Sequence, residues 1–154
     1  MVKKILLALV VVLVVLQFFR PQRNTSPQLI TDNDISQVYP VQDEVHRLLQ
    51  QKCYDCHSNH TNYPWYFSVQ PLAWWLAHHI EEGKRELNFS EFKTYEEKRA
   101  LHKLEEIAEV TEDSSMPLQS YVVLHPHAKL TEADQRAIMT WLNNLPVQWK
   151  KSDH

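Results

Sequence analysis

The chain has 154 residues, enough for one domain with an appendage, and its apolar (44%) and charged (23%) fractions are those of a globular protein rather than a disordered one. It contains one glycine, Gly83, where average usage of about 7% predicts roughly ten. Hairpins and barrels need residues with positive φ at their turns, so this composition argues against them and predicts an all-α fold.

The charge is unevenly distributed along the chain. Of the 16 Lys and Arg residues, four lie in residues 1–23, which contain none of the 19 Asp and Glu residues. The remainder therefore has 12 basic against 19 acidic residues, a net charge of −7. Such an acidic domain argues against nucleic-acid binding and favours a partner protein with a basic patch.

Residues 1–23 have the pattern of a signal-anchor or transmembrane segment. Lys3 and Lys4 precede an apolar run over residues 5–19 that only Gln17 interrupts. As a helix this run spans roughly 22 Å, which is short of the roughly 30 Å hydrocarbon core of a bilayer. No small-residue cleavage site follows, which favours an uncleaved anchor over a cleaved signal peptide. The two lysines favour a cytoplasmic N-terminus, so the rest of the chain is expected outside the cytoplasm.

Residues 24–40 are polar, contain prolines and lack periodicity, and we interpret them as a tether. The folded domain is predicted to occupy residues 41–146, with a polar tail at 147–154. Its first helix begins near Val41, because Val41, Val45, Leu48 and Leu49 share one helical face. This helix leads directly into Cys53.

The most informative stretch is Cys53-Tyr54-Asp55-Cys56-His57. The C-x-x-C-H order is the signature of covalent c-type haem attachment, in which the two thiols bind the porphyrin and the histidine binds the iron. A zinc site would need two more ligands from elsewhere, because the chain has no other cysteine. A thioredoxin-like redox pair would need alternating strands and helices, which are not apparent, and a disulfide would close a strained, short loop.

An aromatic segment follows the haem-attachment sequence. Tyr63, Trp65 and their aromatic neighbours are concentrated within residues 63–67. Beside a porphyrin they would supply flat packing area, with the polar atoms of Tyr63 and Trp65 facing the propionates. An ordinary aromatic core cluster is the alternative interpretation.

Three further helices are predicted. One begins at Pro71 and stops at Gly83, a second occupies residues 94–112, and a third begins at Leu130 and ends before Pro146. Thr131 is a predicted N-cap, with Asp134 as its capping-box partner. The whole domain is therefore expected to be a bundle of about four helices.

Met116 is the leading candidate for the second iron ligand. It lies in a predicted loop rather than on an apolar helical stripe, Pro117 stiffens that loop, and 59 residues separate it from His57, so the chain can pass around the haem. An ordinary loop-packing methionine is the alternative. Among the competing histidines, His79 lies on an apolar stripe and is preferred to His78, and His125 and His127 flank Pro126 in a loop, whereas His102 is expected to face solvent.

The sequence resembles the bacterial haem-binding domain family of small, often membrane-anchored monohaem cytochromes. The resemblance rests on Cys53 to Asn59, Thr61, Tyr63 to Tyr66, Leu87 to Ser90, His102 to Ile107, Met116-Pro117-Leu118 and Leu124-His125-Pro126. It implies haem c bound through Cys53 and Cys56, His57 on the iron and a cytochrome c-like helical core. The expected location is the bacterial inner membrane, with one membrane pass and the haem domain in the periplasm.

Ligation by His57 and Met116 saturates the iron and favours single-electron transfer, so the chain is not expected to be an enzyme. The alternative is a haem-based sensor or peroxidase-like protein with an exchangeable sixth ligand. No paired distal His and Arg is apparent that would support the alternative.

Overall fold

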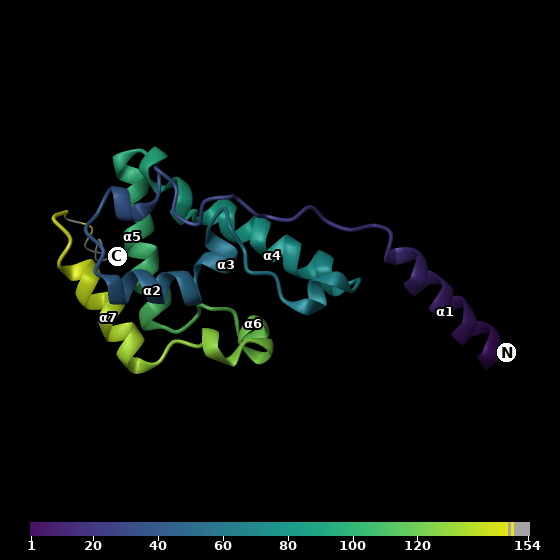
Figure 1. Cartoon of the computed structure of the whole chain (residues 1–154). Helices are drawn as coiled ribbons and strands as arrows, with labels where there is room; N and C mark the ends of the chain where they lie inside the picture. The colour runs from purple at the N-terminus through teal and green to yellow at the C-terminus, as the bar shows by residue number, and fades with distance from the viewer. Residues whose placement is uncertain (148, 150–154) are drawn as a thin grey trace.

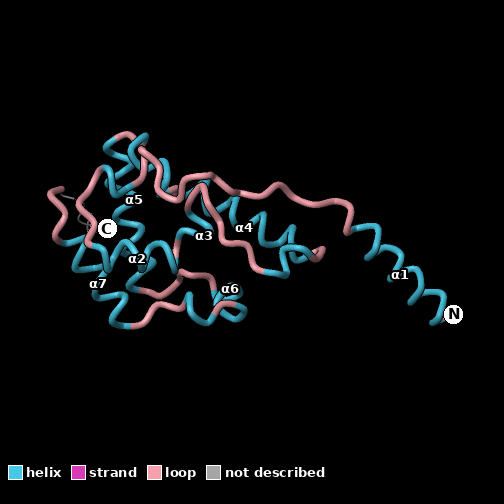
Figure 2. Tube along the Cα trace, in the orientation of Figure 1, coloured by secondary structure: helices cyan, strands magenta, loops and turns pink. Residues whose placement is uncertain are grey.

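The computed structural model describes residues 1–147 and 149, and over these residues the fold is all-helical, with no strand (Figure 2). The all-α part of the predicted fold class is therefore confirmed. The α-helices are α1 (Val2–Leu16), α2 (Asp43–Lys52), α3 (Tyr54–His57), α4 (Leu72–Glu86), α5 (Glu97–Glu112), α6 (Gln119–Leu124) and α7 (Glu132–Asn143). The short 3-10 helices between them are η1 (Ile35–Gln37), η2 (Trp65–Ser68), η3 (Phe89–Thr94) and η4 (Pro126–Ala128).

The larger core is formed where α2, α5 and α7 pack together (Figure 1). Leu49, Leu104 and Leu142 are each fully buried in it, one from each helix. The indole Nε1 of Trp141 donates a hydrogen bond to Pro40 O (3.0 Å), which fastens α7 to the residues before α2. The apolar stripes predicted from helical periodicity therefore face inward.

A smaller core lies around η2, α4 and α6, where Tyr66, Phe67, Leu76 and Tyr121 are buried. Helix α3 lies at the boundary between the two cores. Tyr54 is buried in the larger core, while Cys56 packs against the smaller one. The four-residue turn is thus held from both sides.

Residues 24–40 pack against the domain and are not a free tether. Ile35 and Asp34 are both fully buried, and Thr25 forms an antiparallel bridge with His60. The Asp34 carboxylate accepts hydrogen bonds from the backbone and hydroxyl of Ser36 and from the hydroxyl of Tyr54. The domain therefore begins earlier than the predicted boundary at Val41. The sequence did not reveal this, because such individual contacts leave no periodic pattern.

The predicted helix boundaries need two corrections. Helix α4 continues through Gly83 to Glu86, because Gly83 keeps a negative φ and does not act as a stop. The helix predicted from residue 94 begins at Glu97, after η3. At α7 the prediction is confirmed, because the Thr131 hydroxyl accepts from the backbone of Asp134 and the Asp134 carboxylate accepts from the backbone of Thr131.

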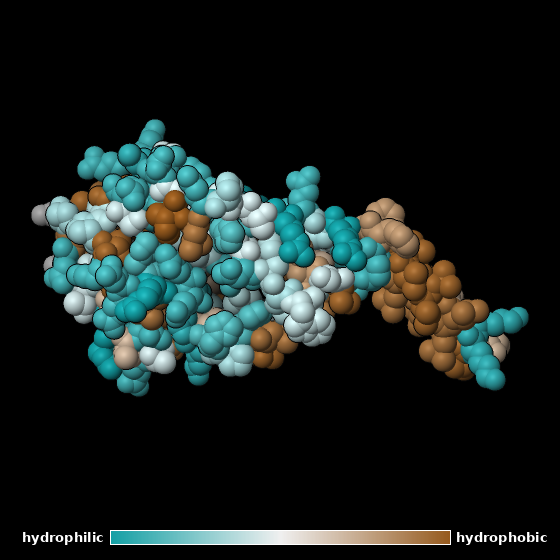
Figure 3. Space-filling model, viewed as in Figure 1, coloured by the Kyte–Doolittle hydropathy of each residue, from teal (hydrophilic) through white to brown (hydrophobic). Residues whose placement is uncertain are grey.

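Helix α1 extends away from the body of the molecule, and none of its residues is buried (Figures 1 and 3). It has 15 residues, and over the part of the chain that the structure describes no helix is long and apolar enough to cross a membrane. The transmembrane helix predicted for residues 1–23 is therefore not supported. At the other end, Trp149 Nε1 donates to Leu142 O (2.7 Å), while residues 148 and 150–154 of the predicted tail lie outside the described residues.

Candidate haem site

The C-x-x-C-H stretch forms a single helical turn. The backbone N–H groups of Cys56 and His57 donate to Cys53 O at 3.2 and 3.0 Å. Residues three and four positions apart lie on one face of a helix, so Cys53, Cys56 and His57 are neighbours. All three line one cavity, of about 460 Å³. The local backbone thus presents both thiols and the imidazole to the same space.

The two residues between the cysteines fasten this turn to the domain. Tyr54 is stacked on Phe89 with ring centroids 5.1 Å apart, and its hydroxyl donates to Asp34 Oδ2 (2.9 Å). The Asp55 carboxylate accepts from the Tyr121 hydroxyl (2.8 Å) and from the backbone N–H of Asn62 (2.9 Å). Sequence analysis missed these roles, because a C-x-x-C-H pattern places no requirement on the two middle residues.

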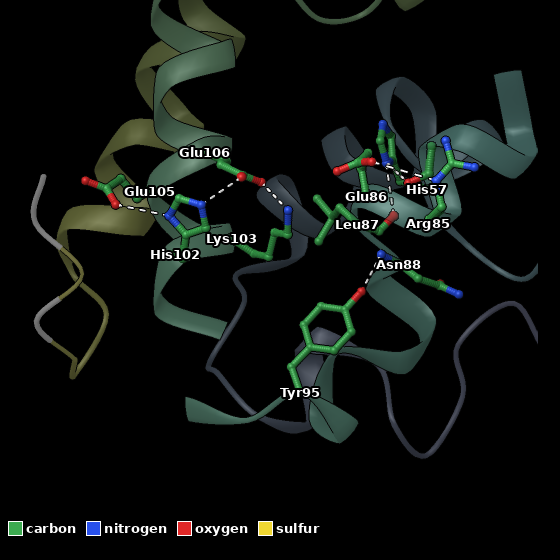
Figure 4. A network of polar contacts seen from close by, with 11 residues as sticks. His57, Arg85, Glu86, Leu87, Asn88, Tyr95, His102, Lys103, Glu105 and Glu106 are labelled. Carbon is green, nitrogen blue, oxygen red and sulfur yellow. Dashed lines mark hydrogen bonds and ion pairs between the residues drawn. The ribbon is translucent and has the colours of Figure 1, made fainter. Parts of the chain in front are cut away.

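His57 is held in one orientation by two backbone carbonyls. Its Nδ1 lies 3.0 Å from both Gly83 O and Leu87 O, at the end of α4 (Figure 4). Carbonyl oxygens only accept, so Nδ1 carries the proton and Nε2 keeps its lone pair. The pKa of His57 is lowered, mainly by burial and to a smaller extent by the positive charge of Lys103. The two hydrogen bonds to the carbonyls act in the opposite direction and only partly offset this. The neutral ring with a free Nε2 is the form that binds a metal.

Gly83 permits the close approach of α4 to this turn. A Cβ atom at Gly83 would lie 2.7 Å from Cys56 O and 3.2 Å from Cys56 Cβ, well inside van der Waals contact. Any other residue would therefore push α4 away and displace the carbonyl that holds His57. The only glycine of the chain is needed at this position for space, since its φ is not positive.

The cavity has an apolar lining with charged groups among it. Its size is within the roughly 300–1,000 Å³ typical of ligand and cofactor sites. Lys52, Asp55, Glu82, Glu86 and Glu106 supply the charged side chains. Glu106 also accepts from the nearly buried Lys103 ammonium at 2.6 Å (Figure 4). The apolar part comes from several elements: Leu49, Trp75, Leu76, Leu87, Phe89, Ile107, Val110, Leu118, Leu130 and Ile138.

Two candidates for the sixth iron ligand line this cavity. Met116 is half-buried in the loop between α5 and α6, and Pro117 and Leu118 line the cavity beside it. His79 lines it from α4, with Nδ1 2.8 Å from the carbonyl oxygen of Trp75 in the preceding turn. His102 is exposed and contacts Glu105 and Glu106, as its sequence position predicted.

Tyr63 and Trp65 are not among the residues that line the cavity. The Tyr63 hydroxyl accepts from the backbone N–H of Asn24 (2.6 Å), and the ring packs on Phe67 with a centroid separation of 4.1 Å. Trp65 is 80% exposed. The aromatic segment therefore supports the N-terminal segment and the surface, and the structure does not bring it to the site.

The donor set fits a haem attached through thioethers better than the alternatives. Cys53 and Cys56 are free thiols, and burial is the main reason that the pKa of each is raised to about 12. A structural zinc site needs four Cys or His ligands, and this turn offers two thiols and one imidazole. Among residues 1–147 and 149, no three His, Cys, Asp or Glu side chains are grouped to hold a metal ion by themselves. The porphyrin of a haem supplies four nitrogen ligands to the iron. Two thiols and one imidazole beside an apolar cavity are therefore enough to hold a haem.

Comparison with known proteins supports haem binding by this domain. Searches of curated proteins and of solved structures found no significant match. A family model for the haem-binding domain matches residues 11–144, which include α2 to α7 and every residue that lines the cavity. The chain belongs to the haem-binding domain family.

Proposed function

We propose that the protein is a membrane-attached, monohaem c-type cytochrome that transfers single electrons. In this proposal Cys53 and Cys56 form thioether bonds to the porphyrin, and His57 and Met116 are the two axial iron ligands. The observation that supports it best is the single turn that presents two thiols and a neutral imidazole to one apolar cavity. The proposal also includes a cytochrome c-like arrangement of the helices around the haem.

Each residue of the site has a defined task in this proposal. A haem with one histidine and one thioether ligand, when bound, supplies one-electron redox chemistry at a raised reduction potential. Gly83 O and Leu87 O hold the proton on His57 Nδ1 and so orient Nε2. The apolar lining excludes water, which keeps the local dielectric constant low. Tyr54 and Asp55 fix the turn, so the ligand geometry does not depend on the cofactor alone.

The choice of Met116 over His79 follows from the direction of His57. The carbonyls that bind Nδ1 belong to α4 and its C-terminal end, and an iron bound by Nε2 would lie on the other side of the imidazole ring from them. His79 is carried by α4 itself, whereas Met116 comes from a separate loop. A ligand for the opposite face of the haem is therefore expected from the Met116 loop.

Membrane attachment at the periplasmic face of a bacterial inner membrane is part of the proposal. The supporting observations are the apolar helix α1, which has no buried residue and carries Lys3 and Lys4 at its start, and the need of c-type haem attachment for export. The acidic remainder of the chain, at −7, suits a redox partner with a basic patch.

Visible and near-infrared spectra of the natively matured protein test this function. We expect the near-infrared charge-transfer band of thioether ligation in the oxidised form and slow or absent carbon monoxide binding in the reduced form. Met116→Ala should abolish the band and open the iron to carbon monoxide, while His79→Ala, the matched control, should leave both unchanged. Absence of the band together with rapid carbon monoxide binding by the unaltered protein would favour a sensor or peroxidase-like function.

A further inference from the structure

Exposed apolar side chains lie on the segments that meet where α1 joins the domain. We call Phe18, Phe19, Trp65, Val69, Leu72 and Trp74 the junction patch. Phe18 is 81% exposed and Trp65 is 80% exposed. The patch residues belong to the segment after α1, to η2 and to the start of α4, and none of them lines the haem cavity. The haem site therefore does not explain their exposure.

Hydrogen bonds hold these segments together although they are about 50 residues apart in sequence. The backbone N–H of Gln70 donates to Gln17 Oε1 (3.0 Å), and Gln70 Nε2 donates to Phe19 O (2.8 Å). Gln70 is only 3% exposed, and Val69 adjoins it in the sequence. The end of α1 is thus fixed against the domain next to Val69 of the patch. Residues 24–40 also pack on the domain, so no free tether separates it from α1.

The chemistry of the junction suits one kind of surface. Tryptophan has an amphipathic ring that prefers the headgroup level of a bilayer, and Trp65 and Trp74 are both in the patch. Arg20 and Arg23 follow α1 directly, in a chain whose remainder is acidic overall. Arg23 lies over the Tyr63 ring at 5.2 Å, close to η2. Hydrophilic residues directly adjoin the brown surface of α1 in Figure 3. The aromatic side chains would contact the lipid chains, and the neighbouring arginines would contact the anionic phosphates of the headgroups.

We propose that the junction patch is a membrane-contact surface that rests in the headgroup region of a phospholipid bilayer. This inference depends on the proposed membrane attachment through α1, but not on the identity of the iron ligands. Because Gln17 and Gln70 fix the helix to the domain, insertion of α1 carries the patch to the bilayer surface. The haem domain is then held in one orientation on the membrane instead of swinging on a linker.

Spin labels on the full, natively matured chain test this proposal. Haem attachment consumes Cys53 and Cys56, so one added cysteine is the only labelling position. Trp65→Cys and Trp74→Cys report on the patch, and Val123→Cys is the control, because Val123 is apolar and 67% exposed on α6. The protein is reconstituted into vesicles of phosphatidylethanolamine and phosphatidylglycerol.

Binding to the vesicles should raise collisions of the labels at 65 and 74 with oxygen, which dissolves in lipid, and lower collisions with a water-soluble nickel chelate. The label at 123 should keep its accessibility to both. Protein that sediments with the vesicles while all three labels stay equally accessible to the nickel chelate would overturn the membrane-contact surface but leave the attachment through α1. Protein that does not sediment with the vesicles would overturn both, while its haem spectrum would still test electron transfer independently.

Discussion

Gly83 lies where α4 approaches the haem-attachment turn, and its missing side chain is what allows that approach. Replacing a helical glycine by alanine usually stabilises a helix by about 0.5–1 kcal/mol. Here the added Cβ would lie 2.7 Å from Cys56 O, so we expect Gly83→Ala to destabilise the protein by about 1–3 kcal/mol through overpacking. Chemical denaturation measures the change.

The exposed Glu81→Ala on the same helix is the control for Gly83→Ala and should change the free energy of unfolding by less than about 0.5 kcal/mol. The test depends on whether Gly83→Ala lowers or raises the free energy of unfolding. A stabilised Gly83→Ala variant would show that α4 does not need this close approach.

Tyr54 connects the turn to the buried carboxylate of Asp34. Removing the hydroxyl leaves Asp34, which is fully buried, with one donor fewer, and unmet hydrogen bonds to buried polar groups cost about 1–3 kcal/mol. Tyr54→Phe should therefore lower the free energy of unfolding by that amount and leave the visible spectrum of the haem unchanged. Tyr39→Phe alters a ring in the same core without touching Asp34 and should cost less; equal losses would contradict the role of the Tyr54–Asp34 bond.

At the residue scale, the sequence predicted the groups that carry chemistry but not those that hold them. Cys53, Cys56, His57 and Met116 were predictable because the haem-attachment pattern and a loop methionine are local features, and all four line the cavity. The tasks of Asp55 and Gly83 depend on contacts with Tyr121 and Cys56, which lie far away in sequence. Tyr63 and Trp65 were assigned to the cofactor only because aromatic residues suit both a porphyrin and a surface.

The start of α7 is the element whose local signal is strongest. Thr131 and Asp134 satisfy each other's backbone N–H groups, so the helix begins where the sequence predicted. Thr131→Ala should lower the free energy of unfolding by about 1 kcal/mol, the usual cost of losing an N-cap. Thr140→Ala, at an exposed position inside the same helix, is the control and should be nearly neutral or slightly stabilising. Equal effects at both positions would show that the cap contributes nothing specific.

At the element scale, periodicity found the helices that build the cores and missed the short ones. The stripes of α2, α4, α5 and α7 repeat over ten or more residues. By contrast, α6 has six residues and α3 has four, too few for a period to be recognised. The end of α4 was misplaced because glycine at a helix end and glycine at a close contact look alike in sequence. The buried η1 has only Ile35 as an apolar signal.

For the whole molecule, the cavity connects folding to the cofactor. Without a haem, the apolar side chains that line this cavity of about 460 Å³ would face water instead of a packed partner, which removes much of their contribution to stability. The total stability of a domain is about 5–15 kcal/mol. We therefore expect protein made without haem to keep helical far-ultraviolet circular dichroism but lose the near-ultraviolet signal of fixed aromatic packing. A matured sample is the control, and an apoprotein with matured-like near-ultraviolet signal and cooperative unfolding would contradict this expectation.

For the whole molecule, the position of the N-terminal segments on the domain was the feature that the sequence predicted least well. Composition separated residues 1–23 and 24–40 from the domain, but it did not reveal that Gln17 and Gln70 hold the first of these segments against it. Those bonds depend on two polar residues without any pattern. The orientation of α1 relative to the haem site could therefore come only from the structure.

Intact-mass spectrometry of the natively exported protein tests the central claim most directly. The account predicts a single species heavier than the polypeptide by one haem, with the haem retained after denaturation and the added mass lost from a Cys53→Ser/Cys56→Ser variant. A species at the bare polypeptide mass, with both sulfurs free or joined to each other, would contradict it.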